Sequence, residues 1–103
     1  MIQAKHVGAA GLANAGSVAA AAGDAWPAAR FLGAAEGIWE SIGYALGPSD
    51  QDDHDAVLSR LSTSLGAERL DRGRREGAAL SLDEAMGEAL LYLGGPEFAA
   101  RTS

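Results

Sequence analysis

The chain has 103 residues, a formal net charge of -6 at pH 7 and no cysteine. This length suits a single domain, and the lack of cysteine excludes a disulfide framework or a thiolate metal site and favours a reducing cytoplasm. The acidic balance disfavours nucleic acid as a partner, because phosphate binding draws on concentrated lysine and arginine. No run reaches the roughly 20 strongly apolar residues of a spanning helix, so we expect no membrane partner.

Strand signals are nearly absent, because β-branched and aromatic residues are few and no stretch alternates apolar and polar positions. The sequence therefore predicts an all-α fold of about five helices in one domain over 1–103. Within it we expect a helical hairpin over 3–43, a three-helix part over 49–93 and a tail over 94–103.

The first predicted helix runs from about Gln3 to Ala22 and is closed by Gly23. Its interior glycines each cost up to about 1 kcal/mol relative to alanine, so it needs a neighbour to persist. This alanine-rich start also loosely imitates a signal peptide, but its glycines and low leucine content favour a loosely packed helix. The side expected to be buried carries Leu12, Ala15, Ala19 and Ala22.

The second predicted helix begins at Asp24 as N-cap, tolerates Pro27 in its first turn and ends at Gly43. Apolar residues recur along it at steps of three and four, which is typical of an amphipathic helix. Its expected core residues are Ala28, Phe31, Leu32, Ala35, Ile38, Trp39 and Ile42.

Three further helices are predicted after the linker "YALGPSDQ". One is capped by Ser49 and buries Val57, Leu58, Leu61 and Leu65; the next spans Ala67 to Ala78, with Leu70 inward and its arginines outward. The last opens with "SLDE", where Ser81 and Glu84 form a capping box, and ends at the "GGP" of 94–96. Its expected core residues are Leu82, Met86, Ala89, Leu90 and Leu93.

Small residues at Gly16, Ala28 and Ala35 would let the first two helices approach closely. With the turn at Gly23 and Leu32 as the large residue, this pattern resembles a tetratricopeptide repeat. The usual tryptophan and aromatic residue of the first helix are replaced by Leu12 and Ala19, which suggests a divergent or terminal repeat.

A second resemblance covers roughly residues 10 to 93. "AARFLGAAEGIWESIG", a proline-containing linker, an acidic helix start and "EGAALSLDEAMGEAL" are similar to the C-terminal helical tail of actinobacterial LuxR-type ATPase and adenylate-cyclase-associated regulators. The resemblance implies a helical scaffold in a regulatory setting, where such repeats bind inducers or partner proteins. The sequence contains no "GxxxxGK[ST]" phosphate loop and no convincing recognition helix.

Two charged clusters are candidate sites. "DQDDHD" lacks the glycine and the closing glutamate of a calcium loop, so we interpret it as a solvated helix start with an exposed His54 and expect no metal or cofactor. The serines and histidines lack the spacing of a nucleophilic site, so we expect no catalytic residues and no enzyme. The one basic patch is interleaved with acids, which favours a face of ion pairs over an acidic protein partner or nucleic acid; it comprises Arg69, Arg72, Arg74 and Arg75.

Trp26 and Trp39 point about 140° apart on one helix, so they cannot both face the centre of the core. Each is interpreted either as a core residue or as a partly exposed residue of a subunit interface. We therefore expect a non-enzymatic association module, with a protein partner or a homodimer, and an interface formed by Val7, Val18, Trp26 and Trp39. The alternative is a small-molecule sensor acting on a separate regulator, with a pocket formed by Trp39, Leu61, Met86 and Tyr92. Direct DNA binding ranks last.

Overall fold

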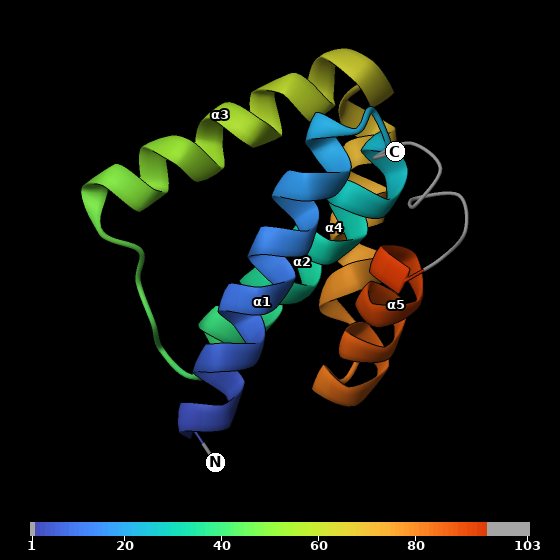
Figure 1. Cartoon of the computed structure of the whole chain (residues 1–103). Coiled ribbons are helices and arrows are strands. Elements are labelled where there is room, and N and C mark those ends of the chain that lie inside the picture. Colours follow the sequence, from blue (N-terminus) through green and yellow to red (C-terminus); the bar gives the residue numbers. More distant parts are fainter. Residues whose placement is uncertain (1, 95–103) are drawn as a thin grey trace.

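The computed structural model describes residues 2–94, which form five helices and no strand (Figure 1). The helices are α1 (Ile2–Ala21), α2 (Ala25–Ser41), α3 (Pro48–Leu65), α4 (Ala67–Ala78) and α5 (Leu82–Gly94). The prediction of an all-α fold with about five helices is confirmed. The expected tail over 94–103 lies, from residue 95 onward, outside the described residues. No described helix is both long and apolar enough to cross a membrane.

Helices α1 and α2 form an antiparallel hairpin, and its turn depends on Gly23 (Figure 1). Gly23 has a φ of 85°, and the Asp24 amide bonds back to the Ala19 carbonyl at 2.9 Å, as in a Schellman motif. Asp24 occupies the predicted N-cap position, but its side chain forms no capping bond. Its carboxylate instead accepts a hydrogen bond from the Tyr92 hydroxyl of α5.

Small residues lie where α1 meets α2, as predicted. A side chain on Gly16 would collide with Leu32, and it would come within 3.4 Å of the Ala28 carbonyl oxygen. Gly16, Ala28 and Ala35 are all buried. On α1, Leu12, Ala15 and Ala19 form the buried side, whereas Ala22 lies past the helix end and is exposed.

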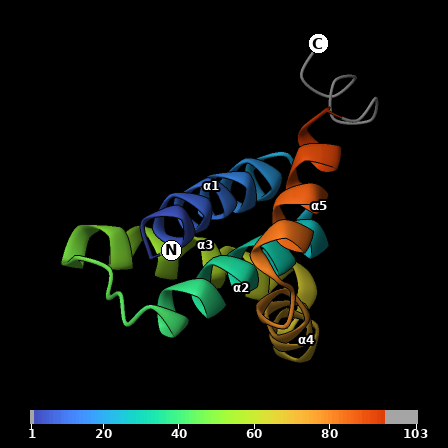
Figure 2. The same ribbon diagram turned by 90° about the horizontal axis from the view of Figure 1, so that it is seen from below.

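Helix α2 lies at the centre of the molecule, with α4 against the side opposite α1 and α5 (Figure 2). The backbones of α2 and α4 touch through glycines. A side chain on Gly33 would overlap the backbone of Arg74, and one on Gly77 would overlap the carbonyl group of Arg30. Gly37 and Gly73 are nearly as close to the opposite helix, so each helix contributes two glycines spaced four residues apart.

The attachment of α3 is looser. Leu61 is its one buried residue, and the other predicted core positions, Val57, Leu58 and Leu65, are half-buried. The prediction of Ser49 as N-cap was wrong: Gly47 is the N-cap and Pro48 is the first helical residue. The fixed φ of proline suits that position, where a backbone N–H would lack a partner.

Helix α5 begins with the predicted capping box. The Ser81 amide donates to Glu84 at 2.9 Å, and the Glu84 amide donates to the Ser81 hydroxyl at 3.1 Å. These bonds lower the pKa of Glu84. The predicted core face of α5 was partly wrong, because Leu90 and Leu93 are 66% and 39% exposed. On α5 only Ala85 and Ala89 are buried, so part of its apolar side is left uncovered by α1 and α2.

Arg30 ties α2 to two other helices. Its guanidinium pairs with Glu76 of α4 and donates to both carboxylate oxygens of Glu88 of α5, at 3.0 and 3.1 Å. Both contacts to Glu88 come from Nη2, and the contact to Glu76 comes from Nη1, so the two ends of one guanidinium hold two different helices. The position of α5 therefore depends on this side chain as well as on apolar contact.

Candidate functional site

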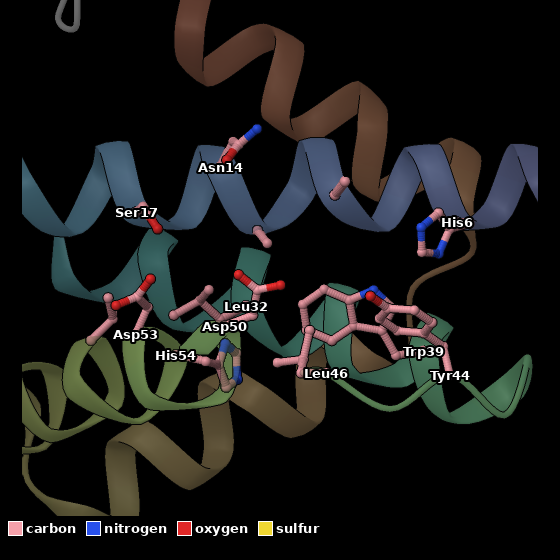
Figure 3. Close-up of a pocket in the computed structure, with 13 residues that line it drawn as sticks. His6, Asn14, Ser17, Leu32, Trp39, Tyr44, Leu46, Asp50, Asp53 and His54 are labelled. Atoms are coloured by element: carbon pink, nitrogen blue, oxygen red, sulfur yellow. The ribbon is translucent and has the colours of Figure 1, made fainter. Parts of the chain in front are cut away.

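A cavity of about 320 Å³ lies between α1, α2 and α3. It exists because α3 stands away from the hairpin, and the segment between α2 and α3 closes one end (Figures 1 and 3). Its apolar wall includes Ala13, Leu32, Leu46 and Val57. Its polar and aromatic lining consists of His6, Asn14, Ser17, Trp39, Tyr44, Asp50, Asp53 and His54.

Aromatic rings gather at one end of this cavity (Figure 3). The ring centroids of Trp39 and Tyr44 are 6.2 Å apart, and His6 meets Tyr44 edge-on at 4.6 Å. Trp39 also meets the His54 ring edge-on at 5.8 Å. Such edge contacts fix the planes of the rings. This end of the cavity therefore has a defined shape.

His54 is held by a chain of side chains that crosses three helices. Its Nε2 lies 2.7 Å from Oε2 of Glu36 on α2. The same carboxylate receives two hydrogen bonds from Arg74 of α4, from Nε at 2.9 Å and from Nη2 at 2.7 Å. The His54 side chain is only 8% exposed. The prediction of an exposed His54 was therefore wrong, because α3 turns this residue inward toward α2.

Glu36 is ionised, and its charge determines which atom donates in the hydrogen bonds that link His54, Glu36 and Arg74. Burial alone would raise the pKa of Glu36, but the hydrogen bonds from His54 and Arg74 outweigh it and hold the pKa below the ordinary value. The bond to Glu36 in turn raises the pKa of Arg74. An ionised carboxylate only accepts, so His54 donates the proton on its Nε2 to Glu36, and Nδ1 is the ring nitrogen that Glu36 does not engage.

Two carboxylates face the cavity from the start of α3. Asp50 and Asp53 lie three residues apart, hence on one side of the helix, and Figure 3 shows both between α3 and α1. Asp52, which lies between them in sequence, is exposed and does not line the cavity. Within residues 2–94 no three acidic or histidine side chains are grouped as a metal site would require.

The four residues of the predicted pocket do not share one cavity. Trp39 lines the cavity described above, whereas Tyr92 lines a second one of about 300 Å³ with Trp26, Arg30 and Glu88. Leu61 and Met86 line neither. That pocket prediction was wrong, because Tyr92 lies against Phe31, with ring centroids 5.6 Å apart, in a cavity that Trp39 does not line.

The predicted interface residues have different environments. Val7 and Val18 of α1 are 65% and 40% exposed, as an interface requires. Trp26 is half-buried beside the second cavity. Trp39 was assigned wrongly as an interface residue, because it is buried in the core next to the first cavity.

The four arginines of α4 do not form one patch. Arg74 binds Glu36 across the helix contact, and Arg75 pairs with Asp71 at 2.6 Å within its own helix. Arg69 lies over the Trp26 ring, 5.9 Å from its centroid, and Arg72 is exposed. Arg75 therefore pairs with an interleaved acid as expected, whereas Arg74 pairs with Glu36 of α2, which sequence reasoning did not identify. Arg69 and Arg72 are both exposed, so these two carry positive charge that α4 presents to solvent.

Sequence reasoning missed Glu36 and Arg30, which join α2 to its neighbours. Each is a charged residue within the apolar run of α2, and that placement is the signal that could have identified them. Their partners lie 18 to 58 positions away, which no local pattern reveals. No family model, curated protein or solved structure matches this chain.

Proposed function

We propose that this protein is a non-enzymatic helical module that acts by protein association, first of all with a second copy of itself. The observation that carries the proposal is an uncovered apolar area on the outer sides of α1 and α5. We call it the α1/α5 surface and define it as Val7, Val18, Leu90 and Leu93, which are all exposed.

The geometry of the two helices supports one continuous surface. Gly8 of α1 lies directly against Leu82 of α5, so the helices adjoin, and Figure 2 shows them side by side over α2. Glu88 faces α2 through its bond to Arg30, and Leu90, two positions on, points about 160° away from it. Leu90 therefore lies on the side of α5 that faces away from α2, and Val7 and Val18 are exposed on the adjoining helix α1.

Association would remove this surface from water. Burial of apolar area stabilises a complex by about 25 cal/mol per Å², and contiguous apolar area on a small protein marks interaction sites. A twofold arrangement places the same area on both copies and leaves none uncovered. The link to transcriptional regulation is supported only by the resemblance of the sequence to the helical tail of LuxR-type regulators.

Sedimentation velocity at micromolar concentration tests the self-association. We expect a dimer that dissociates in the variant Val18→Glu/Leu90→Glu, while the helical circular dichroism stays unchanged. The matched control is Ser59→Glu, which adds a charge at an exposed position of α3 and should remain dimeric. A wild-type monomer throughout this concentration range would refute the proposal.

A second function, small-molecule sensing, is favoured by one observation, the cavity between α1, α2 and α3. Its aromatic end is ordered by edge contacts, and its histidine is held in place by Glu36. Ligand pockets in proteins have this mixture of apolar lining and a few fixed polar groups. In this function the bound ligand would alter how the domain engages a separate regulator.

A further inference from the structure

We infer that the cavity between α1, α2 and α3 takes an organic ammonium ion: a positively charged amine carrying an apolar or aromatic body. This assignment rests on small-molecule binding at the cavity and is independent of self-association. It follows from three features of the lining: its charge, its aromatic end and the position of His54, whose Nε2 is bonded to Glu36.

The fixed charge of the lining is negative. Asp50 and Asp53 contribute two carboxylates, and within residues 2–94 no lysine or arginine lines the cavity. Arg74 is linked to His54 through Glu36, but its Nε and Nη2 are bonded to the two oxygens of Glu36 and are not available to an anion in the cavity. A cation placed between α1 and α3 would therefore meet two carboxylates with no competing positive side chain on the wall.

The opposite end suits an apolar body. Trp39 and Tyr44 present ring surfaces there, and rings of this kind attract cations within about 6 Å of their centroids as well as apolar groups. The volume of about 320 Å³ is near the lower limit of small-molecule sites, about 300 Å³. The ligand is therefore small, with one charged end and one ring or short chain.

His54 adds a fixed acceptor between these ends. Its side chain is more than nine-tenths buried, it lines the cavity, and its Nε2 is occupied by Glu36. Since Glu36 only accepts, Nε2 carries a proton and the neutral form of the ring offers Nδ1 as an acceptor, which suits an ammonium group because that group only donates. A carboxylate ligand would find no donor at this atom.

The test uses three probes of one shape and different charge: 3-phenylpropylamine, 3-phenylpropan-1-ol and 3-phenylpropionate. Binding is followed by tryptophan fluorescence in the full chain carrying Trp26→Phe, so that the signal comes from Trp39. We expect saturable binding of the amine, with the alcohol and the acid at least tenfold weaker. Equal binding of amine and alcohol, or preference for the acid, would overturn the assignment while leaving the cavity a ligand site.

Variants locate the binding. We expect Asp50→Asn and Asp53→Asn each to weaken amine binding about tenfold and to leave alcohol binding unchanged. Asp52→Asn is the matched control, because it removes the same charge from the same turn outside the cavity. Equal losses in all three variants would mean a general charge effect and would contradict the site. Absence of binding by every probe would overturn the sensing function as well, and the sedimentation result would not be affected.

Discussion

Helices α3 and α4 both flank α2, but they are attached in opposite ways. Helix α4 meets α2 backbone to backbone, through Gly33 and Gly77, and leaves no room between them. Helix α3 has one buried residue and stands off far enough to leave a cavity of about 320 Å³. Glu36 is bonded to both helices. Glycines thus allow α4 to pack closely on α2. Helix α3 contains no glycine, and the cavity lies beside it.

The largest expected effect breaks the close contact. Gly77→Ala places a methyl group against the Arg30 carbonyl and the Ala34 amide nitrogen. Both groups are backbone and cannot rotate away, so the helices must separate. We expect the free energy of unfolding to fall by more than about 3 kcal/mol, measured by urea denaturation. The control is Gly11→Ala, where nothing lies within 4 Å; it should stabilise the protein by up to about 1 kcal/mol. Equal behaviour of the two variants would contradict the backbone contact.

The next effect concerns the group that α3 and α4 share. Glu36→Gln leaves Arg74 and His54 without their common carboxylate, and we expect a loss of about 2 kcal/mol of unfolding free energy at pH 7. The folded pKa of Glu36 lies below its ordinary value of 4.5, so its stabilisation is complete above that value and is lost as the pH falls through the folded pKa. The variant should therefore lose less stability than the wild type between pH 5 and about pH 3. A parallel acid dependence would count against this role.

The smallest expected effect tests the open region. Ala13→Leu adds three carbon atoms at a half-buried cavity wall, where space exists, and should change the unfolding free energy by less than about 1 kcal/mol. The same substitution at the fully buried Ala29, which lies against Gly73, should cost about 3 kcal/mol or more. A13L should also abolish binding of the amine probe. A large destabilisation by A13L would mean that the cavity wall cannot accept added volume.

The comparison between α3 and α4 also marks how far the sequence could predict this structure. Helix periods and turn residues identified all five helices, because the capping box at Ser81 and the glycines at 23, 43 and 66 act locally. Gly16 and Ala28 were recognised as a close contact because α1 and α2 are adjacent in the chain. The glycines at 33, 37, 73 and 77 have a spacing that is visible in the sequence, but the pairing of α2 with α4 depends on where the whole chain folds.

The candidate site was less predictable than the fold. Trp39 and His54 were singled out from the sequence, but their meeting requires α3 to fold back onto α2. The Glu36 bonds join residues of three helices, and no local pattern encodes such a set. Leu90 and Leu93 misled the prediction for the converse reason: an apolar period shows which residues share a face, not whether another helix covers that face.

The single buried residue of α3 also affects how the domain fluctuates. Partial openings occur most readily in elements with few buried apolar contacts; the core of this protein is concentrated in α1 and α2, and α4 is held to α2 by close glycine contacts that α3 lacks. Helix α3 can therefore detach and return while the other helices stay folded, and its backbone amides would exchange with solvent faster than those of α2. Such an opening would widen a cavity that already meets solvent at exposed lining residues such as Tyr44 and Asp53.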